Sequence, residues 1–134
     1  MNTKLIMSSA AIVLGLTGMA CLFFPEEIFK LYNPAAGEVQ GLLVQLLGAG
    51  FFGFAALDWV SREAPLGGIY GRPVVSANQT HFVVGSFLVI RAAISQPDNV
   101  VLWCTLVAYA LFAISFSAIL YGPPPTKNTE TTTY

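Results

Sequence analysis

Four long apolar stretches dominate the pattern of hydrophobic and polar positions along the chain. They run approximately over residues 5–24, 39–60, 74–95 and 100–121, and short polar segments separate them. Each is close to the roughly 20 residues with which an α-helix crosses about 30 Å of hydrocarbon. Because short loops join neighbouring antiparallel helices, the pattern predicts an all-α integral membrane protein built as an antiparallel four-helix transmembrane bundle.

The polar segment between the first two stretches carries its own helix signals. Pro25 suits a first helical position, and Glu26 and Glu27 suit a first turn, where acids interact favourably with the helix dipole. Ile28, Phe29, Leu31 and Tyr32 would give this helix an apolar side, and Pro34 would stop it. We expect a short amphipathic helix that lies along the membrane interface.

Composition agrees with a membrane protein. Of the 134 residues, 55% are hydrophobic and only 10% are charged, against about 25% charged in soluble domains. The mean hydropathy is +0.68. The net charge of −1 and the scattered basic residues exclude a nucleic-acid footprint. We divide the chain into a transmembrane domain over residues 1–122 and a flexible Pro- and Thr-rich tail over 123–134.

The start of the chain has two readings. Lys4, the apolar run after it and Cys21 together resemble a secretion signal, but the apolar run continues through Phe24, as a transmembrane span does.

Basic residues beside the spans predict the orientation of the chain, because cytoplasmic loops carry more of them. Both termini are predicted to be cytoplasmic. One side carries four basic residues and the other two, namely Lys4, Arg62, Arg72 and Lys127 against Lys30 and Arg91.

Polar residues near the cytoplasmic ends of the spans are the first candidates for chemistry. Asp58 and His81 fall at similar depth on neighbouring helices, where a carboxylate would orient the imidazole for proton transfer or for binding a polar head group. The alternative is a purely structural polar seam that also contains Asn78, Arg62 and Trp59. These candidates do not form a recognisable catalytic constellation.

A second polar layer lies toward the other side of the membrane. Arg91 and Gln45 are candidates for a ligand-binding pocket beneath the interfacial helix, with His81 and Asn78 as candidates in the first layer. The alternative for Arg91 is that its side chain extends outward to pair with an acid. The acids within reach on that side are Glu26, Glu27, Glu38 and Asp98.

Cys21 and Cys104 are predicted to lie at similar depth, so a disulfide between them is one hypothesis. Unpaired cysteines that act as small apolar residues are the alternative. The chain has no Cys-x-x-Cys sequence, so the main signature of a thiol–disulfide oxidoreductase is missing.

Small residues recur at a spacing of four, which allows close helix packing within membranes. We predict contacts within the bundle or self-association through them. They are Ala11 and Gly15 in the first span and Gly41, Ala49 and Gly53 in the second.

The functional hypothesis that these observations favour is non-enzymatic. The chain would act by helix packing in the bilayer, as an accessory subunit, a scaffold or a homo-oligomer, and so within a larger membrane complex or with its own copies. One alternative is a binder or carrier of a small lipophilic molecule, such as a lipid or quinone. A second is a membrane enzyme that uses an Asp–His pair. We predict no cofactor and no metal, since one histidine and two distant cysteines do not make a zinc site.

Overall fold

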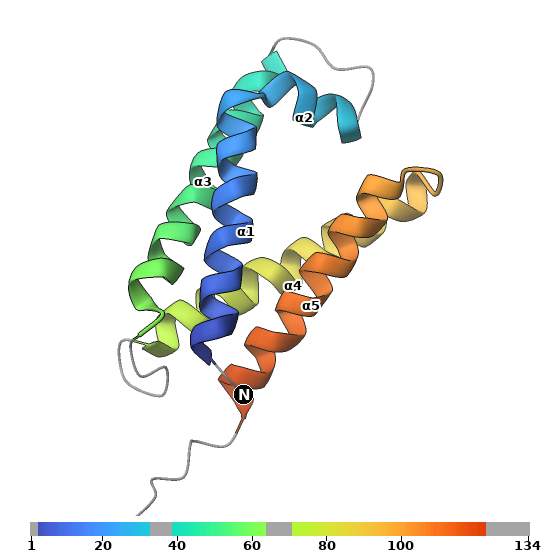
Figure 1. Ribbon diagram of the computed structural model, residues 1–134. Helices are drawn as coiled ribbons and strands as arrows, with labels where there is room; N and C mark the ends of the chain where they lie inside the picture. The colour runs from blue at the N-terminus through green and yellow to red at the C-terminus, as the bar shows by residue number, and fades with distance from the viewer. Residues whose placement is uncertain (1–2, 33–38, 64–70, 123–134) are drawn as a thin grey trace, which may run out of the picture.

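The computed structural model describes residues 3–32, 39–63 and 71–122, which form helices and tight connections (Figure 1). The helices in these ranges are α1 (Thr3–Phe23), α2 (Pro25–Tyr32), α3 (Val39–Ser61), α4 (Gly71–Ser95) and α5 (Val100–Tyr121). All but α2 are long and apolar enough to cross a membrane, as the hydropathy pattern predicts. The predictions for Glu38, for most of the loop between α3 and α4, and for the 123–134 tail concern residues outside the described ranges.

Local sequence explains where the helices begin. The short helix predicted after the first span is present as α2, which starts at Pro25 and has Glu26 and Glu27 in its first turn. Helix α4 starts at Gly71, three residues earlier than the apolar pattern predicts. Its Pro73 lies in the first turn, where a missing backbone N–H leaves no helical hydrogen bond unmade.

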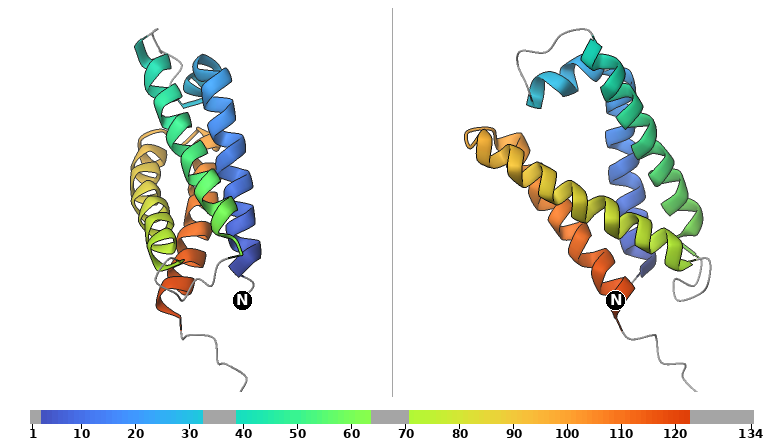
Figure 2. Two further views of the ribbon diagram at one scale, coloured as in Figure 1. Left: turned by 90° about the vertical axis from the view of Figure 1, so that its left-hand side faces the viewer. Right: turned by 180° about the vertical axis from the view of Figure 1, so that it is seen from behind.

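The four long helices associate as two hairpins. Helix α1 lies beside α3, and α4 lies beside α5, with the two helices of each pair running in opposite directions (Figure 1). Figure 2 shows that the hairpins meet at the end where α1 begins and diverge toward the opposite end. Helix α2 leaves α1 at this wider end and extends toward α5.

Glycines allow the backbones of α1 and α3 to approach closely. A Cβ atom added to Gly18 would lie 2.8 Å from the carbonyl oxygen of Gly48, and one added to Gly48 would lie 2.7 Å from the Cβ of Cys21. Farther along the same interface, a Cβ on Gly15 would be in ordinary contact with Ala55, at 3.5 Å. This contact is the small-residue packing common in membranes, where backbone proximity gives dispersion and Cα–H···O contacts.

Aromatic rings hold α4 against α5. Phe82 on α4 is fully buried and stacks on Phe112 and Phe116 of α5, with ring centroids 4.9 and 5.7 Å apart. Such pairs contribute about 0.5–1.5 kcal/mol each beyond the area that they bury. Gly85 leaves room for the ring of Tyr109, which would collide with any added Cβ. The second hairpin is therefore assembled around rings, and the first around glycines.

Candidate binding cavity between the two hairpins

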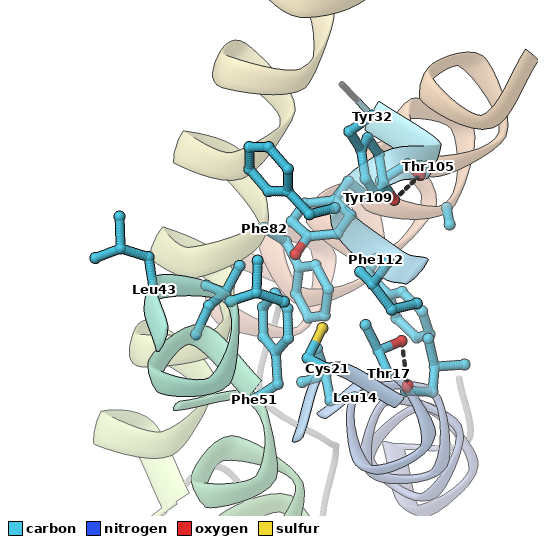
Figure 3. Close-up of a pocket in the computed structure, with 16 residues that line it drawn as sticks. Leu14, Thr17, Cys21, Tyr32, Leu43, Phe51, Phe82, Thr105, Tyr109 and Phe112 are labelled. Carbon is cyan, nitrogen blue, oxygen red and sulfur yellow. Dashed lines mark hydrogen bonds between the residues drawn. The ribbon is translucent and has the colours of Figure 1, made fainter. Parts of the chain in front are cut away.

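The divergence of the hairpins leaves a cavity of about 510 Å³ at the wider end (Figure 3). All five helices of the described chain contribute to its wall, and most of the lining is aliphatic or aromatic. The aromatic part of the wall consists of Phe29, Tyr32, Phe51, Phe82, Tyr109 and Phe112.

Helix α2 forms part of the cavity wall and is joined to the second hairpin by hydrogen bonds. The hydroxyl groups of Tyr32 and Thr105 lie 3.0 Å apart (Figure 3). The side chain of Asn99 donates to the carbonyl oxygen of Leu31 at 3.0 Å and accepts from the backbone N–H of Val101 at 3.1 Å, as the N-cap of α5. One residue therefore starts α5 and holds α2 to the second hairpin.

The polar groups of the cavity wall are few and uncharged. Thr17 donates its hydroxyl hydrogen to the carbonyl oxygen of Val13, within its own helix. The hydroxyl of Tyr109 lies 3.4 Å from Nε2 of His81. None of the described residues that line the cavity carries a charged side chain. The cavity therefore suits a neutral molecule with a large apolar part.

A second cavity, of about 680 Å³, lies between α3 and α4. It shares Leu47, Phe51 and Tyr109 with the first cavity, so these three side chains stand between the two spaces. His81 belongs to the second cavity, where its ring stacks on Phe54 with centroids 4.9 Å apart. His81 therefore does not line the first cavity, but it contacts the hydroxyl group of Tyr109, which does.

The structure does not form the Asp58–His81 pair that depth along the helices suggests. Asp58 accepts a hydrogen bond from the side-chain amide of Asn78, whereas His81 is directed to Tyr109. Helix α4 begins at Gly71, three residues before the start that the apolar pattern predicts, so Asn78 lies at the depth expected for His81, and His81 lies almost one turn farther along the helix. The structure therefore contains an acid–amide pair of Asp58 and Asn78 in place of the predicted acid–base pair. This pair agrees better with the alternative of a structural polar seam that contains Asn78.

Arg91 and Gln45 are also apart. Gln45 on α3 donates to the carbonyl oxygen of Leu22 at 3.4 Å, while Arg91 is exposed on α4. Within the described residues, Arg91 forms no ion pair with Glu26, Glu27 or Asp98. A pocket does lie under α2, but other residues line it.

The two cysteines are free thiols, so the structure contains no Cys21–Cys104 disulfide. Cys21 is buried in the α1–α3 interface beside Gly48, and Cys104 is exposed on α5. Similar depth does not bring them together, because they belong to different hairpins: Cys21 also lines the cavity between the hairpins, whereas Cys104 is exposed.

The predicted small residues fall on two different surfaces. Ala11 is buried, and Gly15 faces Ala55 across the α1–α3 contact. Gly41 and Gly53 have open space where a Cβ would be, and Ala49 is exposed on the same helix. The close contact itself uses Gly18 and Gly48, which the four-residue spacing missed. Their signal is position on the buried face of each helix, beside residues such as Leu14 and Phe51.

Sequence reasoning also missed the hydroxyl groups of Tyr32 and Tyr109, because a tyrosine in an apolar stretch looks like any other aromatic residue.

Comparison with known proteins adds no further assignment. No protein-family model, no curated protein and no solved structure matches this chain.

Proposed function

We propose that this protein crosses a membrane four times, with both termini cytoplasmic as the basic residues predict, and binds one neutral lipophilic molecule between its two hairpins. The observation that carries the proposal is the cavity of about 510 Å³, which has an apolar, uncharged wall in which hydrogen bonds hold α2 to the second hairpin. Its volume lies within the roughly 300–1,000 Å³ of small-molecule sites.

The wall also indicates the chemistry of the ligand. Aromatic and aliphatic side chains match an isoprenoid, an acyl chain or a planar ring, and they cannot compensate a charge that leaves water. Thr105 donates its hydroxyl hydrogen to the carbonyl oxygen of Val101, and Tyr32 donates to Thr105, so these two oxygens can accept a hydrogen bond from a ligand hydroxyl group. The hydroxyl group of Tyr109 can donate to a ligand carbonyl group. A quinone or a neutral lipid has this combination of a long apolar body and a small polar head.

The other two hypotheses have less support. An enzyme that uses Asp58 and His81 lacks the required contact, because each residue has a different partner. An accessory or self-associating role stays a prediction, and the outward-facing Gly41, Ala49 and Gly53 are the surface that it would use. Binding in the cavity is compatible with such a role.

Filling the cavity tests the proposal. Ala108 lines the cavity on α5, and Ala118 is exposed on the same helix, so Ala108→Phe and Ala118→Phe make a matched pair. Each purified protein is extracted with organic solvent, and the extract is analysed by mass spectrometry. We expect a defined molecule with the wild type and Ala118→Phe, and about tenfold less with Ala108→Phe if the added ring costs about 1.4 kcal/mol of binding. Equal amounts from both variants would refute a ligand in this cavity.

A second variant tests the polar contact. Tyr109→Phe keeps the ring that packs against Phe82, with centroids 5.3 Å apart, and removes only the hydroxyl group. A neutral hydrogen bond contributes about 1 kcal/mol, so retention of the same molecule should fall roughly fivefold. Unchanged retention would mean that the ligand's polar group does not use Tyr109.

A further inference from the structure

A buried polar pair joins the two hairpins where they meet. Asp58 on α3 and Asn78 on α4 are both 0% exposed. The amide nitrogen of Asn78 donates to Oδ1 of Asp58 at 2.5 Å and to the carbonyl oxygen of Val74 at 3.1 Å. Both acceptors are oxygens, so they fix which end of the Asn78 amide carries the hydrogens.

The remaining oxygens of the pair lack donors. Oδ2 of Asp58 and Oδ1 of Asn78 are buried and have no hydrogen-bond partner among the described residues. An unsatisfied buried acceptor is unfavourable, and an uncompensated charge in this position is more so. A single hydrogen on Oδ2 of Asp58 would supply the missing donor, because the acid and the amide could then exchange two hydrogen bonds in a ring.

The charged and titratable groups of the neighbouring helices have other contacts or are exposed. Lys4 on α1 and Arg62 after α3 pair with the exposed Glu63, which is beyond the end of α3. On α4, Arg72 is exposed and His81 is directed to Tyr109 of α5. The remaining tyrosine at this end, Tyr121, is exposed. None of these groups forms an ion pair or hydrogen bond with Asp58 in the described chain.

We infer that Asp58 and Asn78 form a one-proton site, in which the Asp58 carboxyl holds a proton and donates it to the side-chain oxygen of Asn78. The ligand of this site is a proton, which binds at the joint between the hairpins. Its release leaves a carboxylate oxygen opposite an amide oxygen, and two acceptors repel. Proton binding therefore stabilises the contact between the hairpins at the end where they meet. The inference does not depend on what the cavity binds.

Variants of similar size distinguish a protonated Asp58 carboxyl from an ionised one. Asp58→Asn places an amide N–H where the proton would be, so it mimics the protonated acid and should preserve the pair. Asp58→Leu has no polar group and leaves the Asn78 amide without this partner. The exchange variant Asp58→Asn/Asn78→Asp restores one acid and one amide with their positions reversed.

Infrared spectroscopy of the protein in nanodiscs tests the site directly, because the C=O stretch of a protonated carboxyl is separate from that of a carboxylate. We expect a protonated-carboxyl band in the wild type at neutral pH. The band should disappear at higher pH, be absent from Asp58→Asn, and return in the exchange variant. No band in the wild type, or a band that persists in Asp58→Asn, would overturn the inference. Loss of the wild-type band on adding Na⁺ at constant pH would also overturn it, in favour of a cation site.

Thermal unfolding gives an independent readout. The wild type should lose stability as the pH rises through the loss of the infrared band, while Asp58→Asn should keep the same melting temperature over that range. If Asp58→Asn does not fold, the wild type and the exchange variant still decide. Parallel pH dependence in the wild type and a folded Asp58→Asn protein would contradict the proton site.

Discussion

The contact between Gly18 and Gly48 sets the separation of α1 and α3, so the smallest enlargement there should part the helices. In Gly18→Ala, the new Cβ would lie 2.8 Å from the carbonyl oxygen of Gly48 and 2.9 Å from the backbone nitrogen of Phe52. Both neighbours are backbone atoms, which cannot rotate away as a side chain can. The helices themselves must move.

The size of that movement follows from ordinary contact distances. The 2.8 Å separation must grow to at least 3.4 Å, a displacement of about 0.6 Å. Overpacking of this kind costs roughly 1–3 kcal/mol. Gly53→Ala is the matched control, because it has nothing within 4 Å of the new Cβ and should only gain the roughly 0.5–1 kcal/mol by which Ala favours a helix over Gly.

Unfolding in mixed micelles, titrated with sodium dodecyl sulfate and followed by circular dichroism, measures both variants. We expect the unfolding equilibrium constant of Gly18→Ala to rise about tenfold for each 1.4 kcal/mol lost. Cys21 lies in the same interface and should react faster with a thiol reagent in Gly18→Ala than in Gly53→Ala. Equal stability of the two variants, with Cys21 equally protected, would refute the close glycine contact.

Three further predictions concern the cysteines, the Lys4–Glu63 ion pair and the N-cap of α5. A maleimide should label Cys104 in the folded protein and Cys21 only after unfolding, because one thiol is exposed and the other buried; labelling that first requires a reducing agent would contradict free thiols. The hydrogen bond from Lys4 lowers the pKa of Glu63 below its ordinary range. The small stabilisation from this pair is therefore present at neutral pH and is lost as the pH falls through that lowered pKa. Lys4→Met should raise the pKa of Glu63 in a ¹³C NMR titration, and an unchanged pKa would exclude the ion pair. Asn99→Ala removes the N-cap of α5 and should cost about 1 kcal/mol in the same unfolding titration, so an unaltered curve would show that the cap is dispensable.

Hydropathy predicts the helices well because crossing a bilayer constrains length and composition directly. The four long helices and α2 begin and end close to the predicted residues, apart from the first turn of α4. Hydropathy does not predict their pairing. Apolar side chains surround each long helix, and many of them are exposed, such as Leu46 on α3 and Phe87 on α4. In a bilayer such side chains need no protein partner, so no apolar stripe marks the contact face.

The candidate site was only partly predictable for the same reason. Depth along a helix follows from counting residues, which is why Asp58 and the polar residues of α4 were placed near one another. The depth estimate depends on where the helix begins, and α4 begins three residues earlier than predicted, so Asn78 rather than His81 lies level with Asp58 and forms the contact. The cavity depends on the divergence of two hairpins, a property of the whole molecule that no local spacing encodes.

Native mass spectrometry of the protein released from nanodiscs tests the central claim most directly, because it reports the number of chains and any retained molecule together. We predict one defined additional mass per chain in the wild type, neutral in chemistry and within the size that a cavity of about 510 Å³ admits. The Ala108→Phe protein should lack this mass, and the Ala118→Phe protein should keep it. A wild-type chain that emerges with no additional mass, or with a variable series of bilayer lipids that Ala108→Phe retains equally, would contradict a binding site between the hairpins.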